Sequence, residues 1–366
     1  MKRLVAALVI SCSSPDAPGV KRPEQPPSPV FTAVLDDGGV RATTAGDAAA
    51  VAAPDPDAVW LRGTTHVHAA PSGDSSEPVD SVIRWYEQHQ YDFIVLTDHN
   101  RVTPVETQQR LIVIPGIELT FNRKGCEPPG DESTQCRIHV NALGVTAKVD
   151  GKLEWSDYKE PQRVKLYERA FVKAQELGAA VVQLNHPQYY WGMTVDVLFA
   201  IADRVPLIEI ANQQFTRWNV GDVNHPSVEK LWDAALLRGH KMWGVATDDA
   251  HDYQADGGGK YPAGGGWVMV KARRDPNAIL AALAAGQFYS STGVTLSRAE
   301  RVGDELVVDV APGTTNQYAI TFIENGKVVA TVKELNAKRA IPWAGYVRAV
   351  VTRDDGKQAW VQPVRH

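Results

Sequence analysis

Histidines and carboxylates recur in this sequence at the ends of short apolar runs. His66 and His68 form a His-x-His pair, and Asp249 and His251 form an Asp-x-His pair with the same spacing. In an extended strand, residues two apart point to the same face, so each pair can present two ligands to one site. Imidazole and carboxylate groups suit zinc, manganese or iron. The spacing therefore predicts a metal centre with nitrogen and oxygen ligands.

Five further polar residues follow, or lie within, other apolar runs. They are Asp98, His99, Glu118, His139 and His186. A single histidine is more often a surface or hydrogen-bonded residue than a ligand, but here six of the ten histidines occur at successive strand ends. Because the carboxyl ends of strands form the active face of α/β enzymes, we expect these side chains to converge on one site.

The apolar runs alternate with segments of helical spacing from residue 59 to about residue 271. The strand-like runs are 60–61, 93–97, 111–114, 138–145, 180–184, 206–210, 242–246 and 267–270. The helical segments are 79–89, 162–177, 195–204, 227–238 and 276–285. This alternation predicts an α/β fold, either a parallel barrel or a doubly wound sheet.

The pattern changes after about Gly293, where short strands are separated by turn signals. Strands are expected at 305–310, 318–324, 327–332 and 347–352. Asn325-Gly326, between two of these strands, is a strong hairpin signal. We therefore expect a small all-β domain at 296–366, following an α/β domain at 58–295.

The first twelve residues have the pattern of an export signal. Lys2 and Arg3 precede a short apolar run that ends in Ile10-Ser11-Cys12. This ending is typical of a bacterial lipoprotein signal peptide, 1–12, with a lipid on Cys12. The alternatives are a plain cleaved signal and a short disordered tail with an incidental cysteine. Residues 13–57 are rich in Pro, Ala, Gly and Asp and predict a flexible tether. We expect an exported protein of the periplasm or cell envelope that touches a membrane only through Cys12.

Composition excludes some partners and some kinds of metal site. The chain is 44% hydrophobic and 22% charged with a net charge of −5, so it has no basic bias toward nucleic acid. Cys126 and Cys136 are close in sequence, which in an oxidising compartment suits a local disulfide; free thiols are the alternative. These cysteines are too few for a cysteine-based zinc site.

In chain order, these motifs resemble the PHP (polymerase and histidinol phosphatase) superfamily of metallohydrolases over roughly residues 59 to 295. The matching segments are Thr65-His66-Val67-His68 with Asp74, Leu96-Thr97-Asp98-His99-Asn100, Pro115-Gly116-Ile117-Glu118, Asn185-His186-Pro187 and Thr247-Asp248-Asp249-Ala250-His251. One departure is that the usual Ser-Asp-Gly is Ser72-Gly73-Asp74 here, with the acid one residue later. The branch that looks most similar includes carbamate hydrolases and exported phosphoesterases.

The resemblance implies a distorted (β/α)7 barrel that holds two or three divalent metal ions. The implied first site is His66, His68, Glu118 and Asp249, the second is Asp74, His99 and His251, and the third is Glu118, His139 and His186. Glu118 would bridge two sites. We take Glu118, Asp249, His251 and Asp98 as catalytic residues. Asp98 would orient a ligand imidazole, or alternatively only stabilise a turn.

Other residues after strand ends are candidates for contact with substrate. They are Arg101, Asn212 and Arg217, for phosphate oxygens, and Tyr189, for the pocket wall. We expect a phosphoesterase that hydrolyses phosphomono- or phosphodiesters of small molecules by a metal-bound hydroxide. The same metal chemistry suits a carbamate or carboxylic ester hydrolase. A non-catalytic surface binding protein, with the β-rich tail as its recognition element, is the alternative from another class.

Overall fold

The computed structural model describes residues 56–366, apart from 106–109, 255–256 and 314. The expected signal peptide ending at Cys12 lies outside the described residues, and so does the expected tether up to residue 55. In the part of the chain that the structure describes, no helix combines the length and apolar character needed to cross a membrane.

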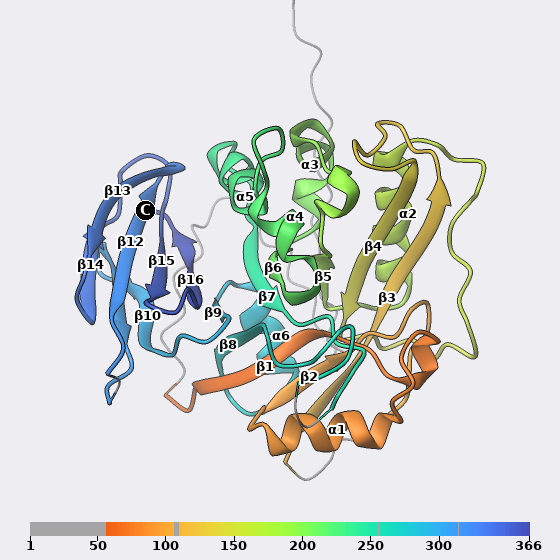
Figure 1. Ribbon diagram of the computed structural model, residues 1–366, viewed down its shortest axis with the longest axis horizontal. Helices are drawn as coiled ribbons and strands as arrows, with labels where there is room; N and C mark the ends of the chain where they lie inside the picture. Colours follow the sequence, from red (N-terminus) through yellow and green to blue (C-terminus); the bar gives the residue numbers. More distant parts are fainter. Residues whose placement is uncertain (1–55, 106–109, 255–256, 314) are drawn as a thin grey trace, which may run out of the picture. The chain divides into compact units, whose positions relative to one another are not determined.

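Nine strands between residues 59 and 291 carry the expected α/β region (Figure 1). They are β1 (Val59–Val67), β2 (Phe93–Leu96), β3 (Ile112–Lys124), β4 (Gln135–Leu143), β5 (Val181–Leu184), β6 (Leu207–Asn212), β7 (Trp243–Thr247), β8 (Trp267–Ala272) and β9 (Phe288–Ser291). Their order in the sheet is β9-β8-β1-β2-β3-β4-β5-β6-β7. The strands pair in parallel at β1–β2, β2–β3, β5–β6 and β6–β7. The mixed α/β class is therefore confirmed.

The expected parallel alternation is interrupted in the middle of the sheet. β3 and β4 form a long antiparallel hairpin, and β4 also pairs antiparallel with β5. The segment 125–134 between β3 and β4 contains no helix, so it cannot make the crossover that parallel neighbours need. Cys126 and Cys136 form a disulfide at this end of the hairpin, with 5.6 Å between their Cα atoms.

One contact brings β1 beside the segment that follows β7, although six strand pairings separate the two strands in the sheet order. Val67 of β1 forms a parallel bridge with Ala250, just after β7, and the His68 N–H donates to the Ala250 carbonyl at 3.1 Å. The carboxyl end of β1 and the segment after β7 therefore lie side by side. Closure of the whole sheet into a (β/α)7 barrel stays a prediction.

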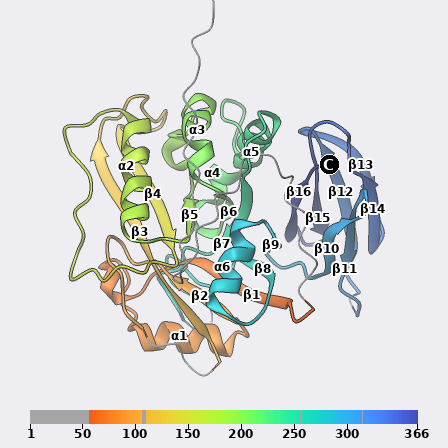
Figure 2. The same ribbon diagram turned by 180° about the vertical axis from the view of Figure 1, so that it is seen from behind.

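The five expected helices are confirmed. They are α1 (Val79–Gln88), α2 (Arg163–Glu176), α3 (Val195–Ile201), α5 (Val228–Leu237) and α6 (Pro276–Ala284). The 3-10 turn η1 (Ala70–Ser72) precedes α1. The short helix α4 (Thr216–Val220) and the 3-10 turns η2 (Tyr189–Trp191), η3 (Ala202–Arg204) and η4 (Gln213–Phe215) lie between α2 and α5. Figure 2 shows α2 against the β3–β4 hairpin. Local capping sets helix starts: Ser227 accepts the Lys230 N–H before α5, and Asp275 accepts the Ala278 N–H before α6.

The C-terminal residues form strands only, as the turn signals predict. They are β10 (Leu296–Val302), β11 (Glu305–Val310), β12 (Tyr318–Glu324), β13 (Lys327–Val332), β14 (Asn336–Ala340), β15 (Val347–Arg353) and β16 (Gln358–Val364). β10, β11 and β14 make a separate antiparallel sheet. The other four continue the large sheet, because β16 pairs with β9. Backbone pairing therefore crosses the expected boundary at residue 295.

Candidate metal centre

The structure brings the nine expected ligands together at one place. His66 lies in β1, Glu118 in β3 and His139 in β4, whereas the other six follow η1 or the strands β1, β2, β5 and β7. Three groups among them place one ligand atom per residue within 4.8 Å of one another. The groups are His66, His68 and Glu118; His68, Asp74, His99 and His251; and Glu118, His139 and His186. Clustered histidines and acids able to hold metal ions are therefore present.

The first group is the most buried. His66 and His68 are 0% exposed, and the Nε2 atom of neither ring has a hydrogen-bond partner among the residues that the structure describes. Each Nε2 lies 3.2 Å from Oδ1 of Asp249, and they lie 3.6 and 3.7 Å from the Oε atoms of Glu118. A buried polar nitrogen without a partner carries a desolvation cost, so two such nitrogens beside two carboxylates fit a cation.

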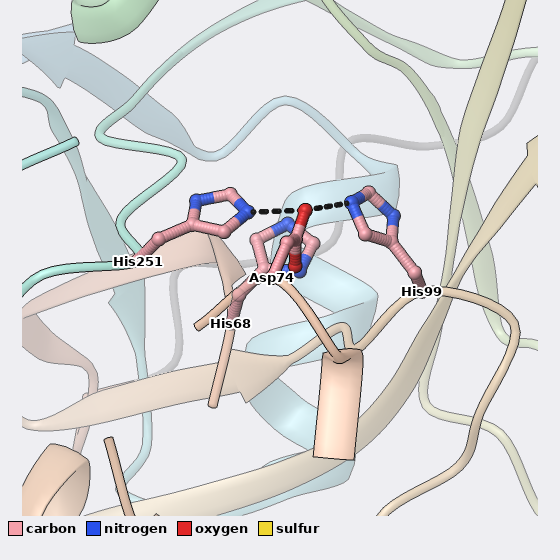
Figure 3. Close-up of side chains that lie close together, drawn as sticks. All are labelled: His68, Asp74, His99 and His251. Atoms are coloured by element: carbon pink, nitrogen blue, oxygen red, sulfur yellow. Dashed lines mark hydrogen bonds and ion pairs between the residues drawn. The ribbon is translucent and has the colours of Figure 1, made fainter. Parts of the chain in front are cut away.

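The second group surrounds Asp74 (Figure 3). Oδ2 of Asp74 lies 3.0 Å from Nε2 of His99 and 3.2 Å from Nε2 of His251. The ring of His68 stacks on that of His251 with 4.2 Å between centroids, so His68 belongs to this group as well as the first. Gly73 has a φ of 92°, a left-handed conformation that glycine adopts readily. This turn brings Asp74 to the site although the acid is one residue later than in the PHP pattern.

The third group is built on the β3–β4 hairpin. Nδ1 of His139 lies 2.9 Å from Oε1 of Glu118, and Nε2 of His186 lies 3.7 Å from the same oxygen. Glu118 therefore belongs to two of the three groups, which is the position expected of a bridging ligand.

Burial and the neighbouring carboxylates shift the pKa values of these imidazoles in opposite directions. Burial lowers the pKa of His68 to about 3 and that of His139 to about 4, the latter in spite of Glu118. Burial also acts to lower the pKa of His99, but Glu118 and Asp74 outweigh it and raise that pKa to about 10. Burial acts to raise the pKa of Glu118, but His139, His99 and His66 hold it well below its usual range.

A carboxylate that the sequence analysis did not identify fixes the first group. Glu209 of β6 is fully buried, and its Oε1 lies 2.7 Å from Nδ1 of His66. It also accepts the His186 N–H at 2.7 Å and the Thr247 hydroxyl at 2.8 Å. The available signal was an acid in the middle of the apolar run Leu207-Ile208-Glu209-Ile210. A buried acid in such a run needs partners inside the protein.

Two buried amides hold the acids of the cluster. Asn185 Nδ2 donates to Oε1 of Glu118 at 2.9 Å. Asn212 Nδ2 donates to Oδ2 of Asp249 at 3.2 Å and to Oε2 of Glu209 at 3.0 Å. Asn212, expected to contact substrate, therefore directs its amide to a candidate metal ligand.

The carboxylate of Asp98 accepts hydrogen bonds from a backbone N–H and a hydroxyl group, whereas an acid that orients an imidazole would accept from the ring. Its Oδ1 accepts the Ala69 N–H at 2.7 Å, and its Oδ2 accepts the hydroxyl of Thr103. These bonds fasten the segment that follows β1 to the one that follows β2. Both bonds are those expected if Asp98 stabilises a turn, which was the alternative role considered for this residue.

The remaining substrate-binding candidates separate into two kinds. Tyr189 lies beside the cluster, with its ring centroid 5.7 Å from that of His186. Arg217 instead pairs with Glu132 of the β3–β4 connection. Arg101 follows β2, and its backbone N–H donates to the Asp98 carbonyl at 3.3 Å.

Aromatic rings form a wall on the His186 side of the cluster. Phe215 stacks on His186 at 4.3 Å, and Tyr189 packs edge-on against Phe215 at 4.6 Å. The backbone here is strained, since His186, Tyr190 and Trp191 have φ values of 24°, 55° and 54°. Non-glycine residues held in this region are concentrated at functional sites.

Comparison with solved structures gives distant likenesses. No family model matches the sequence, and no curated protein matches it. Among solved structures, the chain is similar to a two-domain protein from Bacteroides vulgatus ATCC 8482 described as containing a predicted PHP-like metal-dependent phosphoesterase. The two are 17% identical with a TM-score of 0.43, over 84% of this chain and 96% of that one. A likeness of this size does not identify the activity of this chain.

Proposed function

We propose that this protein is a metal-dependent hydrolase of ester bonds, built on a PHP-type barrel. The observation that carries the proposal is the pair of fully buried imidazoles, His66 and His68, whose unpartnered Nε2 atoms face Glu118 and Asp249. A purely structural histidine pair would satisfy both ring nitrogens of each ring inside the protein.

The residues fit two or three divalent cations. The first cation would be held by His66, His68, Glu118 and Asp249. The second would be held by Asp74, His99 and His251, with His68 nearby. The third would be held by Glu118, His139 and His186. Bound there, a divalent ion such as zinc, manganese or iron lowers the pKa of water from 15.7 toward about 7 and polarises a phosphoryl or carbonyl oxygen.

The protein's own residues prepare this site by fixing protons and orientations. Glu209 beside Nδ1 of His66 orients the ring and would keep a proton on that nitrogen when Nε2 binds a cation. Asn212 and Asn185 donate to Asp249 and Glu118, so both acids are held as oriented carboxylates. Asp249 and Glu118 are thus available, as ionised carboxylates, to bind a cation.

For the substrate, we propose phosphoric monoesters or diesters of small molecules. The charge of the cluster favours this class, because six imidazoles and several cations would surround the phosphoryl oxygens. Carbamate or carboxylic esters are the second candidate, favoured by the aromatic wall of Tyr189 and Phe215 next to His186. Arg217, which pairs with Glu132, is not directed at the cluster by this contact.

We also propose export of the protein, with a lipid on Cys12 as its attachment. The support is the N-terminal sequence and the Cys126–Cys136 disulfide, a bond that persists in oxidising compartments.

The test combines metal analysis with hydrolysis of three chromogenic ester classes. Glu118→Ala and Asp249→Ala should each lower the bound metal and abolish turnover, while circular dichroism shows a folded chain. The control is Glu305→Ala, at a surface acid that pairs with Lys338 in the C-terminal strands.

The substrates are p-nitrophenyl phosphate, bis-p-nitrophenyl phosphate and p-nitrophenyl acetate. Turnover of either phosphate ester would support the proposed phosphoesterase activity. Turnover of the acetate alone would support the second candidate, a hydrolase of carbonyl esters. Full metal content and activity in either cluster variant would overturn the assignment of the site.

A further inference from the structure

Arg137 extends the third group of the cluster along the β3–β4 hairpin. It lies in β4, two residues before His139, and its partner in the antiparallel register is Asn122 of β3. Side chains two apart on a strand, and side chains directly opposite on paired strands, point to the same face of the sheet. Oδ1 of Asn122 lies 2.8 Å from Nε2 of His139, so this face is the one that carries the third group. Arg137 therefore lies on the face of the cluster, one pair further from Glu118 than His139 is.

The guanidinium of Arg137 lies beside two stacked tyrosines that border His186. Its Cζ atom is 5.8 Å from the ring centroid of Tyr190, and Tyr190 stacks on Tyr189 with 4.2 Å between centroids. The ring of Tyr189 in turn lies 5.7 Å from that of His186. Burial and Tyr190 raise the pKa of the Tyr189 hydroxyl to about 12, and Arg137 acts to lower that pKa, as a nearby cation does. The positive charge of Arg137 therefore reaches the rings next to the cluster.

Backbone contacts hold Tyr190 in place beside this arginine. Tyr190 has a φ of 55°, and its carbonyl accepts the Asp131 N–H at 3.2 Å. A Cβ atom at Gly130 would collide with the same carbonyl, so the connection between β3 and β4 packs closely on this turn. A non-glycine residue held in the left-handed region persists only where its surroundings fix it. The ring beside Arg137 is thus fixed by the hairpin that also carries His139.

The guanidinium of Arg137 has no acid to neutralise it. Among the residues that the structure describes, its N–H groups form no ion pair and no hydrogen bond. The side chain is half-buried, so part of its hydration is lost without a replacement. A guanidinium beside a ring keeps the N–H donors at its edge available, and this planar fork matches the oxygens of a phosphoryl group. Arg137 therefore has unused donors at the edge of a cluster that is suited to bind cations.

The candidate ester classes differ in the oxygens that they present to such a site. A phosphoric monoester has three non-bridging oxygens and up to two negative charges, whereas a diester has two such oxygens and one charge. A carboxylic ester has a single neutral carbonyl oxygen. Paired cations engage two oxygens of a phosphoryl group. The third oxygen, which only the monoester has, is left for a donor outside the cluster.

We propose that Arg137 binds a phosphoryl oxygen of the substrate and selects phosphoric monoesters over diesters and carbonyl esters. Its N–H groups donate to the oxygen that the cations leave free. Arg137 thus has the role that the sequence suggested for Arg217, whose guanidinium pairs with Glu132. The inference rests on the proposed metal-dependent hydrolysis for its effect on turnover, but the contact itself can be measured without turnover.

The test measures binding of two non-hydrolysable anions to the metal-loaded, full-length protein by calorimetry. Methylphosphonate presents three oxygens, as a monoester does, and dimethylphosphinate presents two, as a diester does. Arg137→Met should weaken methylphosphonate binding by about 10- to 100-fold, the effect of hydrogen bonds to a charged group. It should weaken dimethylphosphinate binding by no more than about fivefold, the effect of an exposed charge alone. Arg137→Lys keeps the charge without the planar fork, so its affinities should lie in between.

Turnover should show the same selectivity. In Arg137→Met, kcat/KM for p-nitrophenyl phosphate should fall by about 10- to 100-fold, because one contact to the third oxygen is lost. The value for bis-p-nitrophenyl phosphate should fall by no more than about fivefold. A residue with only a structural role would lower both values together.

The matched control is Arg204→Met. Arg204 is likewise half-buried and lies near an aromatic ring, with its Cζ atom 5.6 Å from the ring centroid of Phe171. It precedes β6, whereas Asn212, which holds the cluster acid Asp249, lies at the other end of that strand. Arg204→Met should leave both binding constants unchanged. Metal content and circular dichroism of every variant should match those of the natural protein, which separates loss of the contact from loss of the cluster or the fold.

Three outcomes would overturn the role of Arg137. They are no binding of methylphosphonate to the natural protein, unchanged binding in Arg137→Met, and equal weakening of both anions, which would reduce Arg137 to a general positive charge. Failure of the proposed hydrolysis gives a different result. A natural protein that binds methylphosphonate through Arg137 but hydrolyses no ester would keep the phosphoryl contact and lose the reaction. An active enzyme with an unaffected Arg137→Met variant would keep the reaction and lose this contact.

Discussion

Nδ1 of His66 lies 2.7 Å from Oε1 of Glu209, and both side chains are fully buried. A carboxylate behind a ligand histidine fixes the ring's tautomer and orientation and raises its basicity. The contact therefore explains how a histidine inside the protein can direct a free Nε2 at the cluster.

Glu209→Gln tests this role. Gln keeps the size of the side chain but replaces one acceptor oxygen with an amide donor. Because Glu209 accepts hydrogen bonds through both oxygens, the substitution removes at least one acceptor that is in use. Metal affinity, measured by competition with a chromogenic chelator, should fall by about 10- to 100-fold. Glu324→Gln, at a surface pair with Arg339, is the control. Equal affinities in the two variants would show that Glu209 only fills space.

Metal binding at neutral pH should release protons. The pKa of His99 is raised to about 10, so this imidazole is protonated at pH 7 in the metal-free protein. A metal ligand must lose that proton, so apparent affinity should rise as the pH goes from 7 toward 10. Calorimetry in buffers of different ionisation enthalpy counts the released protons. His99→Gln should release fewer protons; an unchanged number would mean that His99 is not the source.

The same shift predicts how pH affects the metal-free fold. A raised histidine pKa stabilises the folded state fully below the ordinary pKa of about 6.5. This contribution is lost as the pH rises through about 10. Metal-free protein should therefore lose more stability between pH 7 and pH 10 than His99→Gln does, as measured by thermal unfolding.

The sequence predicted which histidines and acids would cluster, because their positions follow from local geometry. The His66-x-His68 spacing places both imidazoles in one group, and strand ends gather the other ligands. Asp249 and His251 instead separate, because Asp249 has a φ of 48° and is not extended. Asp249 lies beside His66 and His68, and His251 lies beside Asp74. Glu209 was missed because no short motif surrounds it. Its role depends on the packing of β6 beside β1 and β7, which sequence spacing does not show.

The antiparallel β3–β4 hairpin and the continuity of β9 with β16 were also outside the sequence prediction. An apolar run is the same whether its neighbour is parallel or antiparallel, so pairing direction depends on the connection. Arg217 shows a further limit. Its place after a strand end suggested a phosphate ligand, but Glu132, far away in sequence, pairs with it.

Arg348 joins the C-terminal strands to helix α5. It is 1% exposed, and its guanidinium donates to both oxygens of Asp233 at 2.7 and 2.8 Å. Arg348→Met leaves a buried carboxylate without its cation and should lower the free energy of unfolding by about 3–5 kcal/mol. Adding Asp233→Leu should recover part of this loss. Urea unfolding measures both, and Arg339→Met, at a more exposed pair, should cost about 0–1 kcal/mol.

The Cys126–Cys136 disulfide should contribute to stability but not to metal binding. It closes a loop with a sequence separation of 10 residues, which restricts the unfolded chain. Replacing both cysteines with serine should lower the free energy of unfolding by about 2–3 kcal/mol and leave metal content unchanged. Reductant should destabilise the natural chain and not the double variant. Loss of metal in the double variant would instead show that the hairpin end positions Glu118 and His139.

Phe215 should distinguish aryl from alkyl substrates if the proposed hydrolase activity is present. Its ring stacks on His186 at 4.3 Å and lies edge-on to Tyr189, so an aryl group bound at the cluster would meet this wall. An aromatic contact is worth about 0.5–1.5 kcal/mol, so Phe215→Leu should raise KM for p-nitrophenyl phosphate by about two- to tenfold. KM for methyl phosphate and both kcat values should change little. Phe199→Leu, at a ring that packs under Arg238, is the control. If Phe215→Leu raised KM equally for both esters, the ring would be positioning His186 and not contacting the substrate.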